Sequence, residues 1–146
     1  MNQKATILTF VMVVGVGFFL ANTGQNFIYS NLEDSHMNDI AGRVSVGPQI
    51  QLADLAVLKA QGIEVVINNR PDGEVAEQPS HEAMAEASAA LGLSYYFIPV
   101  SPRGLTQENV DDMQAALVAT SGPVFAYCRS GNRSGILLQA ATQGGS

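Results

Sequence analysis

The residues best suited to chemistry lie in one short segment, Cys128 to Ser134, which reads CRSGNRS. A strand-like run ends just before it and a helix-like run begins at its end, so several backbone N–H groups and a helix amino terminus would surround the thiol. Such surroundings stabilise a thiolate, and Arg133 adds a planar guanidinium suited to an oxyanion. The segment therefore predicts a nucleophilic cysteine, the alternative being an inert buried one. The expected substrate-binding residues are Arg129, Ser130, Gly131 and Asn132.

Composition narrows the classes of function. The net charge is −6, and Lys and Arg are scattered along the chain, which argues against a nucleic-acid partner. Cys128 is the single cysteine, so no internal disulfide is possible. His36 and His81 are far apart and lack metal-ligand spacing. Neither a metal nor a cofactor is expected.

Strand-like and helix-like segments alternate along the folded part. Short apolar runs predict strands at residues 43–46, 63–67, 93–100 and 124–127. Helices are predicted between them and from residue 134 onward, with Ser80 and Thr106 as N-caps. This order predicts an α/β domain with a central, mostly parallel sheet of about four to five strands flanked by helices. The loops 68–74, 101–104 and 128–133 would then share the carboxyl edge of the sheet, where ligands bind in such folds.

The first 21 residues differ from the rest. Residues 5–21 carry no charge, Lys4 precedes them and acidic residues follow. Their length is at the lower limit for a helix that crosses a bilayer. Phe19 stands where a cleavable signal needs a small residue, so an uncleaved anchor is preferred to a cleaved signal or a soluble core helix. The charge bias places the domain outside the cytoplasm, in the periplasm of a bacterium, or exported if cleavage occurs.

The expected division of the chain follows from these patterns. Residues 1–21 form the membrane anchor or signal, 22–39 a polar linker, and 40–146 the catalytic domain. The last helix has few residues before the chain ends, which is short for covering a sheet face. We therefore expect a truncated product.

Four motifs carry a resemblance to a known family. They are GPQ at residues 47–49, INNRPDGE at 67–74, IPVSPRGLT at 98–106 and YCRSGNRS at 127–134. From about residue 43 to residue 141, the chain resembles the phosphatase-like domain of the beta-lactamase-hydrolase-like proteins, a family similar in fold to dual-specificity protein phosphatases. The resemblance implies that Cys128 attacks phosphorus to form a cysteinyl-phosphate, that Arg133 and the loop amides bind the phosphoryl oxygens, and that Ser134 assists the thiolate as leaving group.

Three features depart from the usual pattern of such phosphatases. Four residues separate Cys128 from Arg133 where five are usual, and Tyr127 replaces a histidine. No aspartate lies in residues 101–104, where a general acid is expected. Asp72 could supply the proton, or it could be an ordinary turn residue after a proline.

The remaining charged and aromatic residues have simpler interpretations. Glu74 could pair with Arg129 or Arg133, and Arg70 could bind substrate or form a structural salt bridge. His81 is expected to be solvated and without a partner. Residues 95–97 are expected to pack in a strand, and Arg103 to be exposed.

Two other functions remain open. The shorter loop resembles the active loops of rhodanese sulfurtransferases, in which Cys128 would carry a persulfide and no general acid would be needed. A non-enzymatic anion-binding module is the third possibility. The phosphatase is preferred because its resemblance covers nearly the whole folded part. The expected partner is a small anionic or sulfane-sulfur substrate, or a phosphoprotein, and no oligomeric state is assigned.

Overall fold

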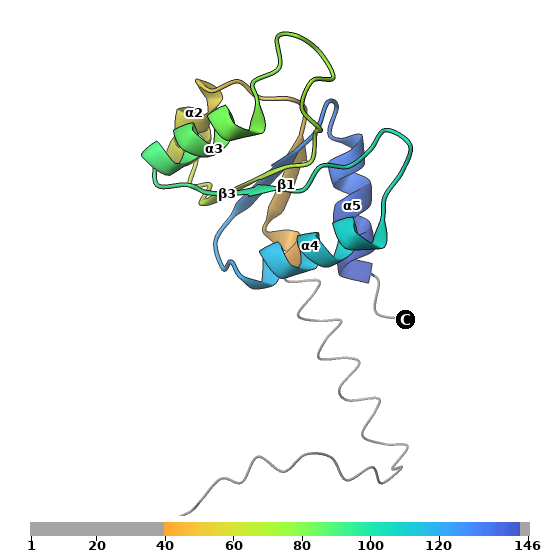
Figure 1. Cartoon of the computed structure of the whole chain (residues 1–146). Helices are drawn as coiled ribbons and strands as arrows, with labels where there is room; N and C mark the ends of the chain where they lie inside the picture. Colours follow the sequence, from red (N-terminus) through yellow and green to blue (C-terminus); the bar gives the residue numbers. More distant parts are fainter. Residues whose placement is uncertain (1–39, 144–146) are drawn as a thin grey trace, which may run out of the picture.

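The computed structural model describes residues 40–143 (Figure 1). The predicted anchor or signal segment and the linker, residues 1–39, lie outside the described residues, as do residues 144–146. Among the helices of residues 40–143, none combines the length and apolar character needed to span a bilayer.

A four-stranded parallel sheet forms the centre of the domain, as predicted. The strands are β1 (Val44–Gly47), β2 (Val65–Asn68), β3 (Ser94–Phe97) and β4 (Val124–Tyr127). Their order is β1-β4-β2-β3, so β4 and β2 are the inner strands. Every residue of β2 is buried, which explains its uninterrupted apolar run Val65–Ile67.

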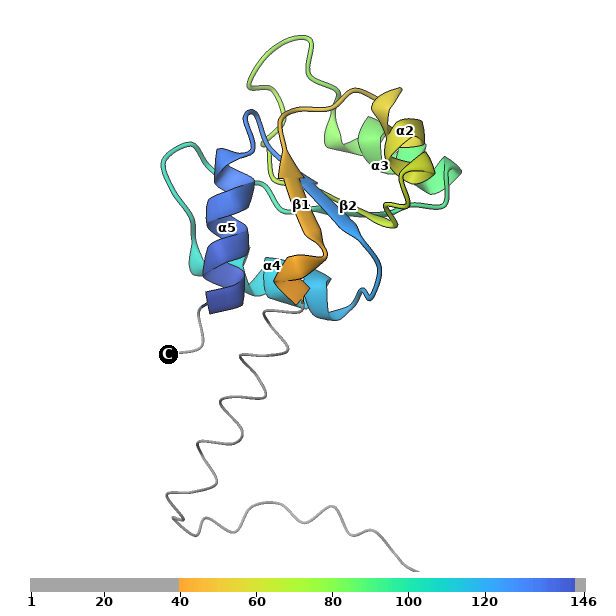
Figure 2. The same cartoon turned by 180° about the vertical axis from the view of Figure 1, so that it is seen from behind.

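Register brings the carboxyl ends of three strands to one level. Asn68 at the end of β2 pairs with Tyr127 of β4 on one side and Phe97 of β3 on the other. The loops that follow these residues leave the sheet at the same end (Figures 1 and 2). The predicted meeting of the three loops at the carboxyl edge is therefore confirmed.

Four helices cover the two faces of the sheet. Figures 1 and 2 show α2 (Asp54–Ala60) and α3 (His81–Ala90) on one face, and α4 (Gln107–Val118) and α5 (Asn132–Gln143) on the other. Each face has its own apolar core, because the side chains of a strand alternate between faces. The α2 and α3 side buries Leu55, Met84 and Val66. The α4 and α5 side buries Met113, Leu117, Leu137 and Ala141.

The predicted caps fix where two helices begin. The Ser80 hydroxyl accepts a hydrogen bond from the backbone N–H of Ala83 at 3.2 Å. Thr106 forms a reciprocal capping box with Asn109, in which each side chain accepts from the other residue's backbone N–H. Each cap therefore fixes the residue at which the preceding loop ends and the helix begins.

The first and second strands are shifted by one or two residues from their predicted bounds, and two further boundaries differ for a structural reason. The third strand ends at Phe97 rather than residue 100, because Pro99 has no N–H for a regular ladder. Ile98 and Val100 still donate backbone hydrogen bonds to Asn68 and Asn69, both at 2.9 Å. The last helix begins at Asn132, two residues earlier than predicted, so it starts inside the cysteine loop.

Candidate functional site

The loop after β4 folds around the Cys128 thiol. Cys128 is fully buried, and the backbone N–H of Gly131 donates to its Sγ at 3.1 Å. Gly131 has a φ of +94°, and a Cβ there would lie 3.2 Å from the carbonyl oxygen of Gly47. Only glycine meets both conditions without strain, so this residue allows the loop to close against the end of β1.

The loop amides stabilise the thiolate. Burial alone would raise the pKa of the Cys128 thiol, but the surrounding backbone N–H groups outweigh it and hold the pKa below its ordinary value. The contributing N–H groups belong to Ser134, Ser130, Gly131 and Arg133. The amino terminus of α5 contributes in the same direction through its dipole. The predicted activated cysteine therefore has a physical basis in the loop.

Arg133 is fixed beside the thiol by a carboxylate. Its Nη1 donates to Glu74 Oε2 at 2.9 Å and its Nη2 to Glu74 Oε1 at 2.8 Å. Nη1 also donates to the carbonyl oxygen of Val100 at 2.9 Å. The Glu74 carboxylate raises the pKa of Arg133 most, and the charge of Cys128 raises it further, so guanidinium and thiolate lie close enough to stabilise each other.

Glu74 also holds Arg70. Arg70 Nε donates to Glu74 Oε1 at 2.7 Å, and its Nη1 donates to Gln49 Oε1 at 3.0 Å. Only 4% of the Arg70 surface is exposed. Of the two roles expected for Arg70, the salt bridge is present, and the substrate contact stays a prediction. Glu74 pairs with Arg133, as one of its two expected options, and Arg133 is the main cause of its lowered pKa.

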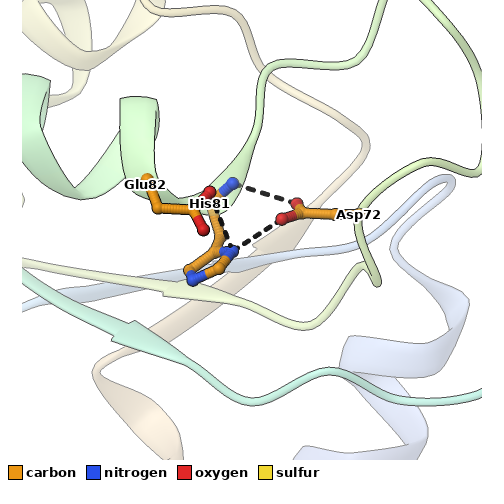
Figure 3. A group of neighbouring side chains, drawn as sticks. All are labelled: Asp72, His81 and Glu82. Atoms are coloured by element: carbon orange, nitrogen blue, oxygen red, sulfur yellow. Dashed lines mark hydrogen bonds and ion pairs between the residues drawn. The ribbon is translucent and has the colours of Figure 1, made fainter.

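Asp72 binds His81 rather than standing free (Figure 3). Its Oδ1 accepts from the His81 backbone N–H at 2.9 Å, and its Oδ2 lies 2.6 Å from His81 Nδ1. Oδ1 therefore binds a backbone N–H at the start of α3 and Oδ2 binds the side chain of the same histidine, which fits the turn interpretation of Asp72. These contacts engage both oxygens of the carboxylate that the sequence offers as a proton donor.

The side chain of His81 is 32% exposed, so it is partly solvated as predicted, but it has partners that were not predicted. Its ring stacks on Phe97 with a centroid distance of 4.1 Å, and Glu82 Oε2 lies 3.3 Å from its Nδ1. Oxygen and nitrogen atoms of Asp72, His81 and Glu82 lie within 4.8 Å of one another. Asp72 and His81 are nine positions apart and meet because the loop between them folds back. No spacing pattern in the sequence predicts this contact.

The other residues considered from the sequence differ in how far they are buried. Ser134 is fully buried, and its Oγ has no hydrogen-bond partner within residues 40–143. Arg129, Ser130 and Asn132 are exposed at the outer side of the loop, as is Arg103 on the loop after β3. Tyr127 is buried, which raises the pKa of its hydroxyl and keeps it neutral.

The comparison with protein families agrees with this geometry. Residues 36–145 match the family model of the phosphatase-like domain of the beta-lactamase hydrolase-like protein. The chain belongs to this family. The predicted resemblance is confirmed, and the domain is a phosphatase-like one. The cysteine loop and the Asn69–Glu74 segment both lie inside the matched region.

Relatives of the family include much longer proteins. The beta-lactamase hydrolase-like protein of Agrobacterium fabrum is 39% identical over 92 residues, which are 63% of this chain and 21% of the relative. That of Xylella fastidiosa is 33% identical over 105 residues, which are 72% of this chain and 24% of the relative. The chain thus spans about a fifth to a quarter of the curated relatives it matches.

Solved structures share the fold. A candidate phosphatase from Neisseria meningitidis is 30% identical with a TM-score of 0.57, over 65% of this chain and 68% of that one. A candidate phosphatase from Shewanella putrefaciens has a TM-score of 0.61 at 23% identity, over 70% of this chain and 68% of that one. The four-stranded parallel sheet with its flanking helices is therefore the fold of this group.

Proposed function

We propose that this domain hydrolyses a phosphate monoester through a cysteinyl-phosphate on Cys128. The observation that carries the proposal is the buried thiol of Cys128, which accepts from the Gly131 N–H at 3.1 Å in the loop that also carries Arg133. The Sγ thiolate attacks phosphorus, so an S–P bond forms while the ester P–O bond breaks and the leaving oxygen takes up a proton. Water then attacks phosphorus, which breaks the S–P bond, releases phosphate and restores the thiolate.

Each loop residue has a role in this scheme. The amides and Arg133 bind the non-bridging oxygens, whose charge changes in the transition state. Arg129, Ser130, Gly131 and Asn132 form the outer part of the anion site. Ser134 is buried behind the thiol with an Oγ that has no partner within residues 40–143, so its hydroxyl is free to donate to Sγ when the cysteine leaves.

The proton for the leaving group limits the substrate. A positioned general acid contributes about 10²–10⁴-fold. Asp72 is the only residue proposed for this role, and His81 occupies both of its oxygens. Esters with stable leaving groups, such as aryl phosphates, should therefore react best. A small ester or a phosphoprotein with such a leaving group fits the site.

A second candidate function is sulfur transfer, favoured by the engaged state of Asp72 and the short loop. The Cys128 thiolate would attack the sulfane sulfur of a donor such as thiosulfate, forming an S–S bond as sulfite leaves with the electron pair. A thiol or cyanide would then attack the outer sulfur and release the thiolate. Neither step needs a proton donor, and the loop amides would stabilise the persulfide anion.

One parallel experiment separates these functions. The purified full chain and its Cys128→Ser variant are offered an aryl phosphate, and separately thiosulfate with cyanide, while intact mass reports any phosphoryl or persulfide adduct. Phosphate release that the substitution abolishes supports the phosphatase. Thiocyanate formation without phosphate release would contradict the phosphatase and support the sulfurtransferase. Anion binding without turnover, unchanged by the substitution, would leave the non-enzymatic module.

We further propose that residues 5–21 anchor the domain to a membrane, with the domain on the extracytoplasmic side. The uncharged run and the preceding Lys4 support this. Fractionation of cells that express the full chain tests it. An anchored chain stays in the membrane fraction after alkaline carbonate extraction, whereas release by carbonate would contradict the anchor.

A further inference from the structure

The guanidinium of Arg133 has two edges, and hydrogen bonds within residues 40–143 occupy one of them. The end-on edge, formed by the outer N–H groups of Nη1 and Nη2, is bound by both oxygens of Glu74. The second Nη1 hydrogen goes to the Val100 carbonyl. Within residues 40–143, two donors remain: the Nε–H and the Nη2 hydrogen beside it.

These two donors point the same way, because a guanidinium is planar. They form the side-on fork, a geometry that matches two oxygens of a phosphate, sulfate or carboxylate. Arg133 and Cys128 belong to the same closed loop, in which the Gly131 N–H donates to Sγ, and the charge of Cys128 acts on the guanidinium, so the fork belongs to the same site as Sγ.

We propose that Glu74 is a positioning residue that holds Arg133 by its end-on edge and thereby presents the side-on fork to an oxyanion at Cys128. Arg70 contributes indirectly, since its bond to Glu74 Oε1 and its bond to Gln49 fix the carboxylate from behind. Glu74 is only 19% exposed at its side chain, and its ion pair with Arg133 joins the loop after β2 to α5.

This role makes an unusual prediction about sign. Glu74 is an anion beside an anion site, so removing its charge should strengthen anion binding if charge were its only contribution. If Glu74 positions Arg133, the loss of geometry should weaken anion binding despite the removed charge. The two explanations therefore predict opposite changes for the same substitution.

The test uses the single thiol of the full chain. Alkylation of Cys128 by iodoacetamide is followed by intact mass at increasing inorganic phosphate, and in parallel at increasing thiosulfate, so protection gives the affinity of each anion. The variants are Glu74→Gln, which removes the charge, and Glu74→Asp, which keeps it but shortens the side chain. Glu77→Gln and Glu77→Asp are matched controls, since Glu77 is an exposed glutamate on the same loop.

We expect both Glu74 variants to bind the protecting anion about tenfold more weakly, which corresponds to about 1.4 kcal/mol. The Glu77 variants should stay within about twofold of the parent. Unchanged or tighter binding by a folded Glu74→Gln would overturn the proposal. Thermal unfolding shows whether each variant is folded. If Glu74→Gln does not fold, Glu74→Asp tests the proposal, because a charge-only role predicts unchanged anion binding for Glu74→Asp.

The inference rests on the anion site of the proposed function, and a second readout separates the two. The pH dependence of Cys128 alkylation without any anion reports the position of Arg133 directly. Displacement of the guanidinium in Glu74→Gln raises the thiol pKa, whereas a charge-only role lowers it. If neither anion protects the parent, the proposed function fails, and this pH shift alone supports or overturns the role of Glu74.

Discussion

Arginines at opposite ends of the sheet show two different uses of one side chain. Arg43 precedes β1 at the amino edge, and its Nη groups donate to Thr120 Oγ1 and to the carbonyl oxygens of Gly122, Leu117 and Thr120, at 2.6 to 3.2 Å. These neutral acceptors satisfy the last turn of α4, so Arg43 ties that helix to the strand.

Arg133 at the carboxyl edge is bound differently. Its acceptors are a carboxylate and one carbonyl, which leave two adjacent donors beside an activated thiol. An arginine whose terminal donors are used by backbone carbonyls and a hydroxyl stabilises the fold. One that is held firmly but keeps a free edge beside a nucleophile has the features of a binding site. This difference leads to five predictions, taken from the largest effect to the smallest.

Replacing the nucleophile should have the largest effect. Cys128→Ser should reduce turnover of the active substrate, aryl phosphate or thiosulfate, on the order of 10⁴-fold or more, because serine is not ionised at neutral pH. The measurement is initial rate, with thermal unfolding showing that the variant is folded. Residual turnover within tenfold of the parent would exclude Cys128 as the nucleophile.

Replacing the binding arginine should come next. Arg133→Lys keeps the charge but removes the planar fork and the paired hydrogen bonds to Glu74, so kcat/KM should fall about 10²–10³-fold. Steady-state kinetics on the same substrate measures this. Equal activity of Arg133→Lys would show that point charge, and not the fork, binds the substrate.

The matched change at the other edge should affect stability alone. Arg43→Lys should lower the free energy of unfolding by about 2 kcal/mol, because several carbonyl groups lose their donors. Its kcat/KM per folded molecule should match the parent. Urea unfolding measures the change in stability, and steady-state kinetics measures kcat/KM. A loss of activity in the folded variant would break the distinction between the two arginines.

The pH dependence of the thiol should follow its lowered pKa. Alkylation of Cys128 by iodoacetamide should reach its plateau at lower pH than that of the denatured chain, whose thiol has a pKa of about 8.5. Because the folded pKa is depressed, the linked stabilisation is present above the unfolded thiol pKa and is lost as pH falls through the folded one. Coincident pH profiles for folded and denatured chains would contradict this.

Removing the charge of Asp72 should have the smallest effect. Asp72→Asn weakens the cap on α3 by about 1 kcal/mol and should change turnover of an aryl phosphate less than about threefold. Thermal unfolding and initial rates measure the two effects. A loss of about 10²-fold with an alkyl phosphate, but not with the aryl ester, would instead identify Asp72 as the general acid.

Local signals predicted most of the fold. Ser80 and Thr106 were predicted as N-caps because a hydroxyl just before a helical run satisfies orphan N–H groups, and both act as such. The fourth strand has the predicted bounds Val124–Tyr127. The apolar pattern predicts too long a third strand, because it continues through Val100 although Pro99 interrupts the hydrogen-bond ladder.

The site was predictable where its residues are neighbours in sequence. The cysteine loop keeps its own amides around Sγ, so its chemistry could be inferred from seven consecutive residues. The roles of Arg70 and His81 were harder to predict from the sequence, because they depend on partners that are not their neighbours in the chain. The salt bridge of Arg70 with Glu74 was one of two options, and the contact of His81 with Asp72 and Phe97 was missed.

The sequence by itself determined the parallel α/β fold and placed the candidate nucleophile and the arginine that follows it in one loop, since short-range hydrogen bonding and apolar periodicity specify these features. Only the tertiary structure decided which edge of Arg133 is free. That depends on Glu74, which lies 59 positions away and reaches Arg133 because the loops after β2 and β4 leave neighbouring strands at the same edge. Contacts of this kind arise from chain topology, and no local pattern encodes them.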